Sequence, residues 1–274
     1  MNSSTDDKDE DLETIITWND AQIRWTDNVV RHDDDDDDDD DAPPNVLAPN
    51  PHQTFTFQNS IIQLRGYTYE SDQTWKSTGL TVWKASEYLS HYLLSQRQLL
   101  EEKRVLELGA GLGLCGIVAH RLLQARTVYV TDGDSDVLHV MKQNIQANRS
   151  VERHNNNIIS GHQLLWGAEY APPFLQIMRR MESENDALLF DVILAADVVY
   201  VPQVIAPLFE TVQTLLEPAT GVFLLAFARR MVDVTLDDVL QEATRADFVY
   251  KQCSSDQDTE QGLYLYAFRR VMKR

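Results

Sequence analysis

The sequence predicts an α/β fold, a mainly parallel β-sheet with helices on both faces. From residue 103 onward, short apolar segments rich in β-branched residues alternate with longer segments of helical periodicity. A glycine-rich turn joins the first apolar segment to the first helical one. Near the C-terminal end, two strand-like segments follow each other with no helix between them. The alternation indicates parallel strands joined by crossover helices, and the last pair indicates one antiparallel strand.

The predicted elements follow this alternation in order. Residues 54–69, which include TFTF and IIQLRGYTY, predict two strands with a turn at Gln58 to Ser60, an N-terminal β extension. The segments DFVYKQ and LYLYAFRR, separated by polar residues at 253–262, should pair as an antiparallel hairpin. Between these regions we expect strands at 103–108, 127–132, 158–165, 190–196 and 221–227, and helices at 112–124, 134–148, 173–182, 203–216 and after 232.

The negative charge is concentrated before the predicted fold. The formal net charge is -19, and residues 1–50 hold seventeen acidic side chains against three basic ones. Nine consecutive aspartates at 33–41, followed by prolines, predict a largely disordered acidic arm over 1–50 and a folded domain over 51–274. A solvated spacer is the simpler interpretation of the arm, and attraction of a Lys-rich partner is the alternative. Because no large basic cluster is present, we expect no nucleic-acid partner.

The cysteine, histidine and apolar patterns exclude several classes. Neither Cys115 nor Cys253 belongs to a C-x-x-C pair, so we expect a reducing compartment and no zinc. The seven histidines show no ligand spacing, and we predict no metal site. The acidic N-terminus argues against a signal peptide, and no apolar run approaches the roughly 18 residues that span a bilayer. We expect a soluble monomer without membrane partners, in the cytoplasm, with the nucleus as a second location.

A glycine loop follows the first strand of the alternation. The segment VLELGAGLG places Gly109, Gly111 and Gly113 between a strand and a helix, where the backbone turns tightly and can approach a ligand. Gly111, Gly113 and Gly116 also satisfy G-x-G-x-x-G, so a dinucleotide-binding loop is an alternative. If Leu108 ends the strand, that fingerprint starts at Gly109 and needs glycine at position 114, which is leucine. The register therefore argues against a pyrophosphate-binding loop.

Two carboxylates accompany the loop. Asp132 ends the second strand of the alternation, 23 residues after Gly109, where a carboxylate can accept hydrogen bonds from two ribose hydroxyls. The alternative for Asp132 is the N-cap of the helix that follows. Glu107 lies just before the loop and suits a cationic ligand. Together with the glycines, these residues indicate a site for a nucleoside-containing cofactor.

The segment VLELGAGLGLCGIVA resembles the cofactor motif of the seven-β-strand S-adenosylmethionine-dependent methyltransferases. Three further segments are similar to the protein-lysine methyltransferase group called methyltransferase family sixteen: TGLTVWKASEYLSHYL at 78–93, LLWG at 164–167 and FDVILAADVVY at 190–200. The resemblance covers roughly residues 53–270. It implies a Rossmann-like, seven-stranded sheet with one antiparallel strand, and S-adenosyl-L-methionine as the cofactor.

The resemblance also implies the residues of the site. Asp197 and Tyr200 would face the substrate lysine. The second strand runs on into Asp134 and Asp136, and we favour Asp132 as the ribose ligand because it ends the apolar strand. Cofactor contacts are expected from Trp83, Gly109, Ala110, Gly111, Asp132, Trp166 and Ala196, and Glu107 and Gly113 of the loop motif complete the expected cofactor set.

The predicted function is methylation of a lysine side chain in a non-histone or other basic protein. Methylation of a small amine or of another protein nucleophile is the first alternative, a weakly active cofactor-binding interaction module is the second, and a dehydrogenase is more distant. Methyl transfer from a sulfonium requires alignment of the nucleophile and exclusion of water. The attacking lysine must be neutral, so we expect a desolvated channel shaped by Tyr200 and Trp83, with Asp197 orienting the amine.

Overall fold

The computed structural model describes residues 52–67, 78–149, 157–181, 189–229 and 234–271. The acidic arm predicted over residues 1–50, with its run of aspartates, lies outside the described residues. Within the described part of the chain, no helix is long and apolar enough to cross a membrane.

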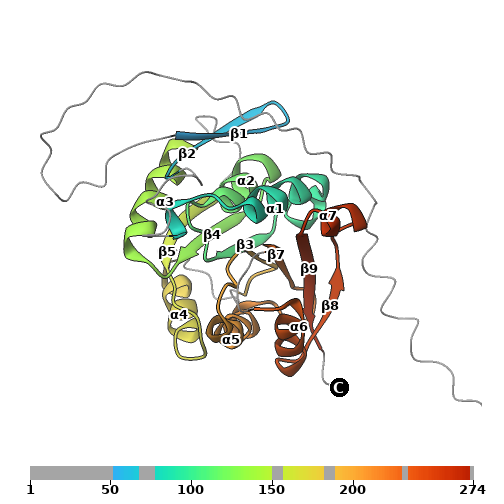
Figure 1. Cartoon of the computed structure of the whole chain (residues 1–274). Coiled ribbons are helices and arrows are strands. Elements are labelled where there is room, and N and C mark those ends of the chain that lie inside the picture. The colour runs from blue at the N-terminus through green and yellow to red at the C-terminus, as the bar shows by residue number, and fades with distance from the viewer. Residues whose placement is uncertain (1–51, 68–77, 150–156, 182–188, 230–233, 272–274) are drawn as a thin grey trace, which may run out of the picture. The chain divides into compact units, whose positions relative to one another are not determined.

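The fold is built on a seven-stranded sheet in the order β5-β4-β3-β6-β7-β9-β8 (Figure 1). Its strands are β3 (Arg104–Leu108), β4 (Thr127–Asp132), β5 (Ile158–Gln163), β6 (Val192–Ala196), β7 (Val222–Ala228), β8 (Phe248–Gln252) and β9 (Leu263–Arg270). Strand β9 runs antiparallel to both of its neighbours, and every other pairing in the sheet is parallel. The prediction of a mainly parallel, seven-stranded sheet with one antiparallel strand is confirmed.

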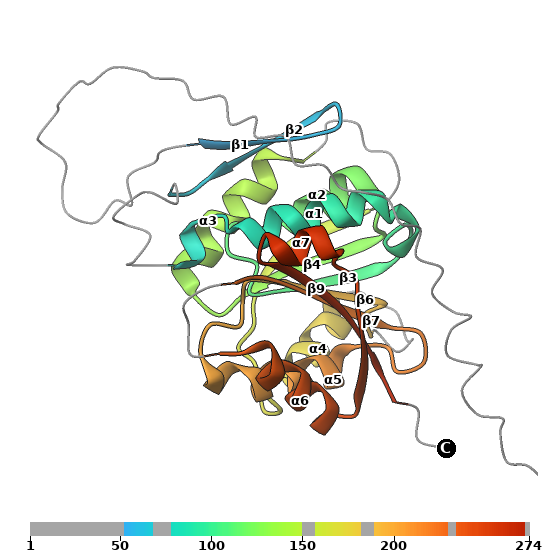
Figure 2. The ribbon, with the colours of Figure 1, turned by 45° about the vertical axis from the view of Figure 1, so that its right-hand side comes forward.

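Helices cover both faces of this sheet, as predicted (Figure 2). Helices α1, α2 and α3 lie on one face, and α4, α5 and α6 lie on the other. Every residue of β3 and β6 is buried, because both strands are central and carry helices on each side. The helices are α1 (Lys84–Ser95), α2 (Leu114–Leu123), α3 (Ser135–Ala147), α4 (Ala171–Met181), α5 (Ile205–Leu215), α6 (Leu236–Arg245) and α7 (Asp256–Glu260).

The connection between β8 and β9 corrects one prediction. These strands do pair antiparallel, but a short helix, α7, lies between them where only a turn was expected. The Ser255 hydroxyl accepts a hydrogen bond from the Asp258 N–H, and the Asp258 carboxylate accepts one from the Ser255 N–H at 2.8 Å. This capping box satisfies two backbone donors of the first turn and stabilises a helix in a segment too short to show periodicity.

The predicted N-terminal β extension is present as the hairpin β1 (His52–Phe57) and β2 (Ser60–Arg65). Its turn is at Gln58, which has a left-handed φ of 53°. The hairpin forms a separate two-stranded sheet, and β2 packs against α3. The hairpin therefore extends the layer of helices on that face and does not extend the central sheet.

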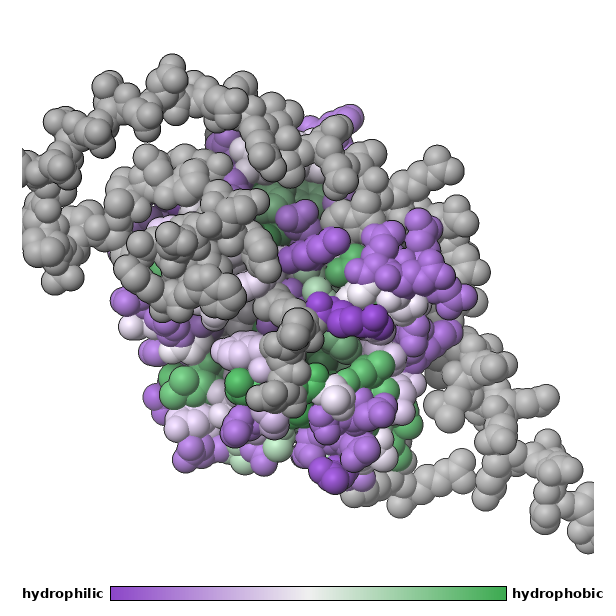
Figure 3. All heavy atoms as spheres, in the orientation of Figure 1, coloured by the Kyte–Doolittle hydropathy of each residue, from purple (hydrophilic) through white to green (hydrophobic). Residues whose placement is uncertain are grey.

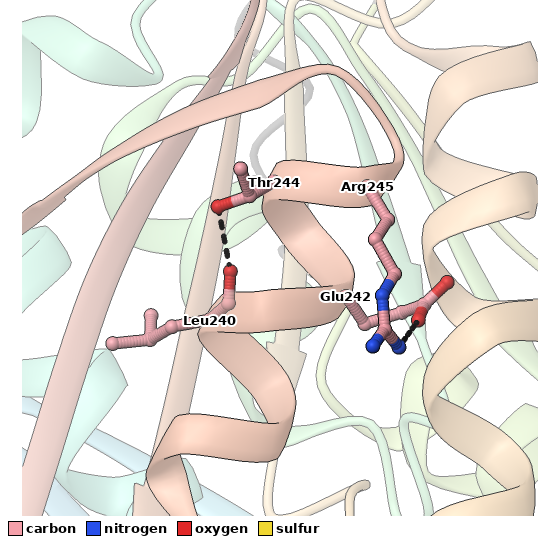
Figure 4. Close-up of polar contacts among 4 residues, drawn as sticks. All are labelled: Leu240, Glu242, Thr244 and Arg245. Atoms are coloured by element: carbon pink, nitrogen blue, oxygen red, sulfur yellow. Dashed lines mark hydrogen bonds and ion pairs between the residues drawn. The ribbon is translucent and has the colours of Figure 1, made fainter.

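Helix α6 is held mainly by its buried side. Figure 4 shows its last turns, where the Thr244 hydroxyl donates to the Leu240 carbonyl at 2.9 Å and the Arg245 guanidinium lies 3.2 Å from the Glu242 carboxylate. The Arg245 side chain is 70% exposed, so this ion pair contributes less than about 1 kcal/mol. Val239, which is 2% exposed, anchors the helix in the hydrophobic core, and α6 packs against β8 and α5. The start of α6 also lines a second cavity.

Candidate functional site

The strand order places a ligand site at the centre of the sheet. Strands β4 and β5 follow β3 on one side, whereas β6 and β7 lie on the other, so the order reverses between β3 and β6. In open α/β sheets, ligands bind outside the carboxyl ends of the strands at such a switch point. Here those ends are Leu108, Asp132 and Ala196, which close β3, β4 and β6.

A cavity of about 670 Å³ opens at this edge, and we refer to it as the main cavity. Its volume is in the range of sites for small molecules and cofactors. The predicted site residues that line it are Trp83, Gly109, Ala110, Gly111, Asp132, Trp166, Ala196, Asp197 and Tyr200. Glu107 and Gly113 do not line it. The structure thus brings both predicted substrate residues and all but two of the predicted cofactor residues to one cavity.

The glycine loop can be built only with glycine at its critical positions. Gly109 and Gly111 have left-handed φ angles of 60° and 55°. A Cβ atom on Gly109 would lie 2.8 Å from Val198 Cγ1 and 3.1 Å from Trp166 Cζ2. On Gly111 it would lie 2.9 Å from the Gly79 carbonyl oxygen. The loop is therefore packed between the end of β6 and the turn before α1, and any side chain there would push these walls apart.

Asp132 is positioned by the loop that it faces. Its Oδ2 accepts a hydrogen bond from the Gly111 N–H at 3.0 Å, and its Oδ1 accepts one from the Asp134 N–H at 3.1 Å. Burial raises the pKa of this carboxyl group, and the two backbone N–H groups oppose the shift. The helix cap is formed by Asp134, whose Oδ1 accepts from the Asp136 N–H at 2.8 Å. Asp132 therefore lines the main cavity without serving as the N-cap of α3.

Glu107 lies behind the loop and not in the main cavity. Its side chain is 2% exposed, and Oε2 accepts a hydrogen bond from the Gly116 N–H at 2.7 Å. Burial raises the pKa of Glu107 to about 8, despite the opposing bond from Gly116. The glutamate joins β3 to the first turn of α2, because a buried acceptor satisfies a backbone donor that the start of a helix leaves unpaired.

Two tryptophans form walls of the main cavity. Trp83 is the N-cap of α1, and its indole N–H donates to the Thr78 carbonyl at 2.8 Å, which orients the ring. Trp166 lies against Gly109. The peptide after Trp166 is held by α5, because the Gly167 N–H donates to the buried Thr211 hydroxyl at 2.8 Å. Both tryptophans are half-buried and line the main cavity.

Asp197 is held in an uncommon conformation at the end of β6. Its φ is 57°, in the left-handed region, which aspartate tolerates better than most residues. Its N–H donates to the Ala226 carbonyl at 2.8 Å. Its Oδ1 accepts from the Ala228 N–H at 2.9 Å, and its Oδ2 accepts from the Ala85 N–H at 3.4 Å. The carboxylate thus joins β7 to the start of α1, beside the main cavity.

Several residues that line the main cavity were not predicted. The Thr78 to Gly79 turn, Leu165, Tyr170 and Gln203 all contribute to it. Leu165, Tyr170 and Tyr200 are among the large apolar or aromatic side chains that remain exposed, at 47%, 40% and 46%. Figure 3, drawn in the orientation of Figure 1, shows hydrophobic side chains among hydrophilic ones in its lower half, where Figure 1 places α4, α5 and α6. Thr78, Gly79 and Leu165 lie within the segments 78–93 and 164–167 that resemble the family, but no local signal marks Tyr170 or Gln203. The connections that carry these residues converge only in the folded chain.

Metal coordination has no candidate site within the described ranges. Among those residues, no group of three or more histidine, cysteine, aspartate or glutamate side chains is arranged to hold an ion. Cys115 is buried and Cys253 is half-buried, and both are free thiols.

Comparison with known proteins agrees with this geometry. The chain is 26% identical over 198 residues to a protein-lysine N-methyltransferase, EFM3, of Chaetomium thermophilum, covering 72% of this chain and 53% of that protein. It is 34% identical over 163 residues to the mouse protein N-lysine methyltransferase METTL21A, covering 59% of this chain and 64% of that protein. It is 31% identical over 173 residues to mouse methyltransferase-like protein 22, covering 59% of this chain and 44% of that protein.

The chain spans about half the length of the fungal relative and less than half of methyltransferase-like protein 22. A family model described as lysine methyltransferase matches residues 68–242. That match includes the glycine loop, Asp132, both tryptophans of the main cavity and the segment from Asp197 to Tyr200. Since it extends over more than half of the sequence, the chain belongs to the lysine methyltransferase family.

Proposed function

We propose that this chain is an S-adenosyl-L-methionine-dependent protein-lysine N-methyltransferase. One observation carries the proposal: a single main cavity is lined both by the glycine loop with Asp132 and by Asp197 with Tyr200. The first group suits a nucleoside-containing cofactor, and the second lies at the end of the neighbouring strand β6. A cofactor and an acceptor could therefore meet without crossing a protein wall.

The residues of the cofactor half fit the proposed cofactor. Asp132 presents a carboxylate for the ribose hydroxyls at the carboxyl end of β4. The loop from Gly109 to Gly111 brings backbone close to the ligand because it carries no side chains at its two glycines. Trp166 provides a flat aromatic face for the adenine ring. When bound, S-adenosylmethionine would supply a methyl group attached to a positively charged sulfur.

The acceptor half is suited to a lysine amine. A lysine attacks only when it is neutral, although its ordinary pKa is about 10.4. Trp83 and Tyr200 provide aromatic walls that reduce hydration, which disfavours the charged ammonium. Asp197 would accept a hydrogen bond from the amine and direct its lone pair toward the methyl carbon. The neutral amine held there would accept the methyl group that the cofactor supplies, and the proton that the amine gives up would leave to solvent.

The substrate assignment rests on the family and on the form of the main cavity. The mouse and fungal relatives are named as lysine methyltransferases acting on proteins, and we extend that substrate class to this chain. Because residues 1–50 are strongly acidic, a basic protein is the partner we favour. We further propose that the protein acts as a monomer in the cytoplasm, with the nucleus as a second location.

The decisive experiment is transfer of a labelled methyl group from S-adenosylmethionine into proteins of a lysate, followed by mass spectrometry of the labelled peptides. Two variants test the acceptor half, Asp197→Asn and Tyr200→Phe. Each has a matched control on β8 or just before it. Asp247 shares the left-handed φ, at 60°, and Tyr250 is 45% exposed, close to the 46% of Tyr200. The controls are Asp247→Asn and Tyr250→Phe.

We expect labelled lysines with the wild-type chain and at least about a tenfold loss of turnover in Asp197→Asn, equal to about 1.4 kcal/mol of transition-state stabilisation. Tyr200→Phe should lose less, and both controls should retain wild-type turnover. Cofactor affinity should persist in Asp197→Asn. Labelled small amines with unlabelled protein would favour the first alternative substrate class, and bound cofactor without any transfer would favour a binding module.

A further inference from the structure

A second, smaller cavity lies on the other side of the wall that contains Asp197. It has a volume of about 200 Å³, and we call it the side pocket. Its lining comes from the segment after β6, the end of β7, the start of α6 and β9, with Val199, Phe227, Leu236 and Tyr264 as its main apolar members. Small-molecule sites usually exceed about 300 Å³, so the side pocket has room for about one large side chain.

The wall between the two cavities is one residue thick. Val198 and Tyr200 line the main cavity, whereas Val199 lines the side pocket. Neighbouring side chains of this segment therefore enter opposite cavities. The same wall is tied to β7, because Asp197 accepts a hydrogen bond from the Ala228 N–H at 2.9 Å and Ala228 itself lines the side pocket. The segment that carries Asp197 at the main cavity therefore also forms part of the side pocket.

Among the described residues, the lining of the side pocket is largely apolar and includes the cation Arg229. Phe227 stacks on Tyr264 with ring centroids 5.3 Å apart and an interplanar angle of 18°. The Arg229 guanidinium carbon lies 5.7 Å from the centroid of the Tyr264 ring, and the same guanidinium donates to the Tyr264 hydroxyl. These contacts hold Arg229, which is exposed, in a defined place. The floor excludes charged side chains, since burying an unpaired charge there would be costly.

We propose that the side pocket receives an apolar side chain of the substrate protein that lies within two residues of the methylated lysine. This inference rests on the proposed function. Successive residues of an extended peptide advance by about 3.3 Å, and adjacent Cα atoms of the wall are about 3.8 Å apart. An extended substrate with its lysine in the main cavity therefore brings a neighbouring side chain to the side pocket. Burial of that side chain would select among lysines in a protein.

The test uses the full-length chain and an array of lysine-centred peptides in which each flanking position is varied. Each peptide is assayed for methyl transfer from labelled S-adenosylmethionine, and separately for binding in the presence of S-adenosylhomocysteine. Two variants make the side pocket polar, Val199→Thr and Leu236→Asn. The matched control is Val249→Thr on β8, which makes the same change at a side chain that is 45% exposed and lines neither cavity.

The wild-type chain should prefer leucine, isoleucine, phenylalanine or methionine over serine or aspartate at one position by about tenfold or more in kcat/KM, the scale of discrimination by an apolar pocket. Val199→Thr and Leu236→Asn should reduce this preference to about threefold or less, and Val249→Thr should retain it. Melting temperature and cofactor affinity identify a variant that has not folded. In that case the second variant decides, because Val199 and Leu236 come from different elements.

Each other outcome has a defined meaning. Peptides methylated without an apolar preference would overturn this inference and leave the proposed function standing. An apolar preference in binding, lost in both variants but without methyl transfer, would support the side pocket and overturn the proposed chemistry. If the apolar preference survives in both variants, another surface of the protein produces it, and the side pocket does not. A change of molecular mass in solution on Val199→Thr would show that a second copy of the chain covers the side pocket, against this proposal.

Discussion

At the scale of single residues, the walls of the main cavity depend on side chains that never reach it. Thr211 on α5 is fully buried, accepts a hydrogen bond from the Gly167 N–H and donates one to the Pro207 carbonyl, both at 2.8 Å. Glu210 accepts another bond, from the Ala168 N–H at 3.1 Å. Helix α5 thereby holds the peptide that follows Trp166. The buried Thr211 hydroxyl and the Gly167 N–H satisfy each other. Trp166 is therefore positioned through the backbone that follows it.

Replacing Thr211 by valine should therefore disturb the cofactor half of the site. The Gly167 N–H would lose its acceptor, at a cost of about 1–3 kcal/mol in the free energy of unfolding. We expect weaker cofactor binding and a change in tryptophan fluorescence, measured by titration with S-adenosylhomocysteine. Thr211→Ser retains the hydroxyl and should restore both.

The control for this prediction is Thr214→Val on the same helix. The Thr214 hydroxyl donates to the Glu210 carbonyl one turn back and supports no loop, so its loss should leave cofactor affinity unchanged. Equal affinity in Thr211→Val and the wild-type chain would show that Trp166 is positioned by packing alone.

At the scale of elements, the hairpin β1–β2 is attached to the domain by two amide side chains. The Asn148 side chain accepts from the Gln63 N–H at 3.2 Å and donates to the Gln63 carbonyl at 2.7 Å. Asn144, one turn earlier on α3, makes the same pair of bonds to Arg65 at 2.7 and 3.1 Å. The two asparagines thus satisfy backbone groups along the free edge of β2. Without them, this exposed edge would be open to pairing with other chains.

Asn148→Ala should loosen the hairpin more than the rest of the fold. It leaves the outward N–H and carbonyl of Gln63 without partners, and we expect a loss of about 1–3 kcal/mol in unfolding free energy. Hydrogen exchange should become faster at the amide of Gln63 while the amides of β3 keep their protection. Gln146→Ala, at an exposed position on the same helix, is the control. Uniformly faster exchange in β2 and β3 would contradict a local role.

At the scale of the whole molecule, Glu107 connects stability to pH. Burial raises its pKa from the ordinary value of 4.5 to about 8, so the folded protein retains a proton that the unfolded chain releases. Its contribution to stability is complete below pH 4.5 and is lost as the pH rises through about 8. The free energy of unfolding should fall across this window, by at most about 1.4 kcal/mol for each pH unit.

The variant Glu107→Gln isolates this effect. Its amide oxygen can still accept the hydrogen bond from the Gly116 N–H, but the side chain does not titrate. We therefore expect the stability of Glu107→Gln relative to the wild-type chain to increase steadily between pH 5 and pH 8, as measured by urea unfolding at several pH values. Parallel stability curves for the two proteins would show that the carboxyl group titrates normally.

The sequence alone was sufficient for most of the fold because the relevant signals are local. The strand at 127–132 has the predicted bounds, and the glycine loop lies between a strand and a helix as expected. A helix or strand is specified by periodicity within about ten residues, and the left-handed conformations of the loop at Gly109 and Gly111 are specified by glycine. The family could be inferred because its motifs are short, contiguous segments.

Tertiary structure decided everything that depends on which distant segments meet. Contacts between distant segments set the strand order, the burial of Glu107 and the support of Trp166 by Thr211. The surroundings of two near neighbours in the chain decide that Asp134, and not Asp132, caps the helix. The side pocket beyond Asp197 likewise needs four elements to form. Long-range contacts, burial and shared walls are properties of the packed fold, and they leave no periodic trace in the sequence.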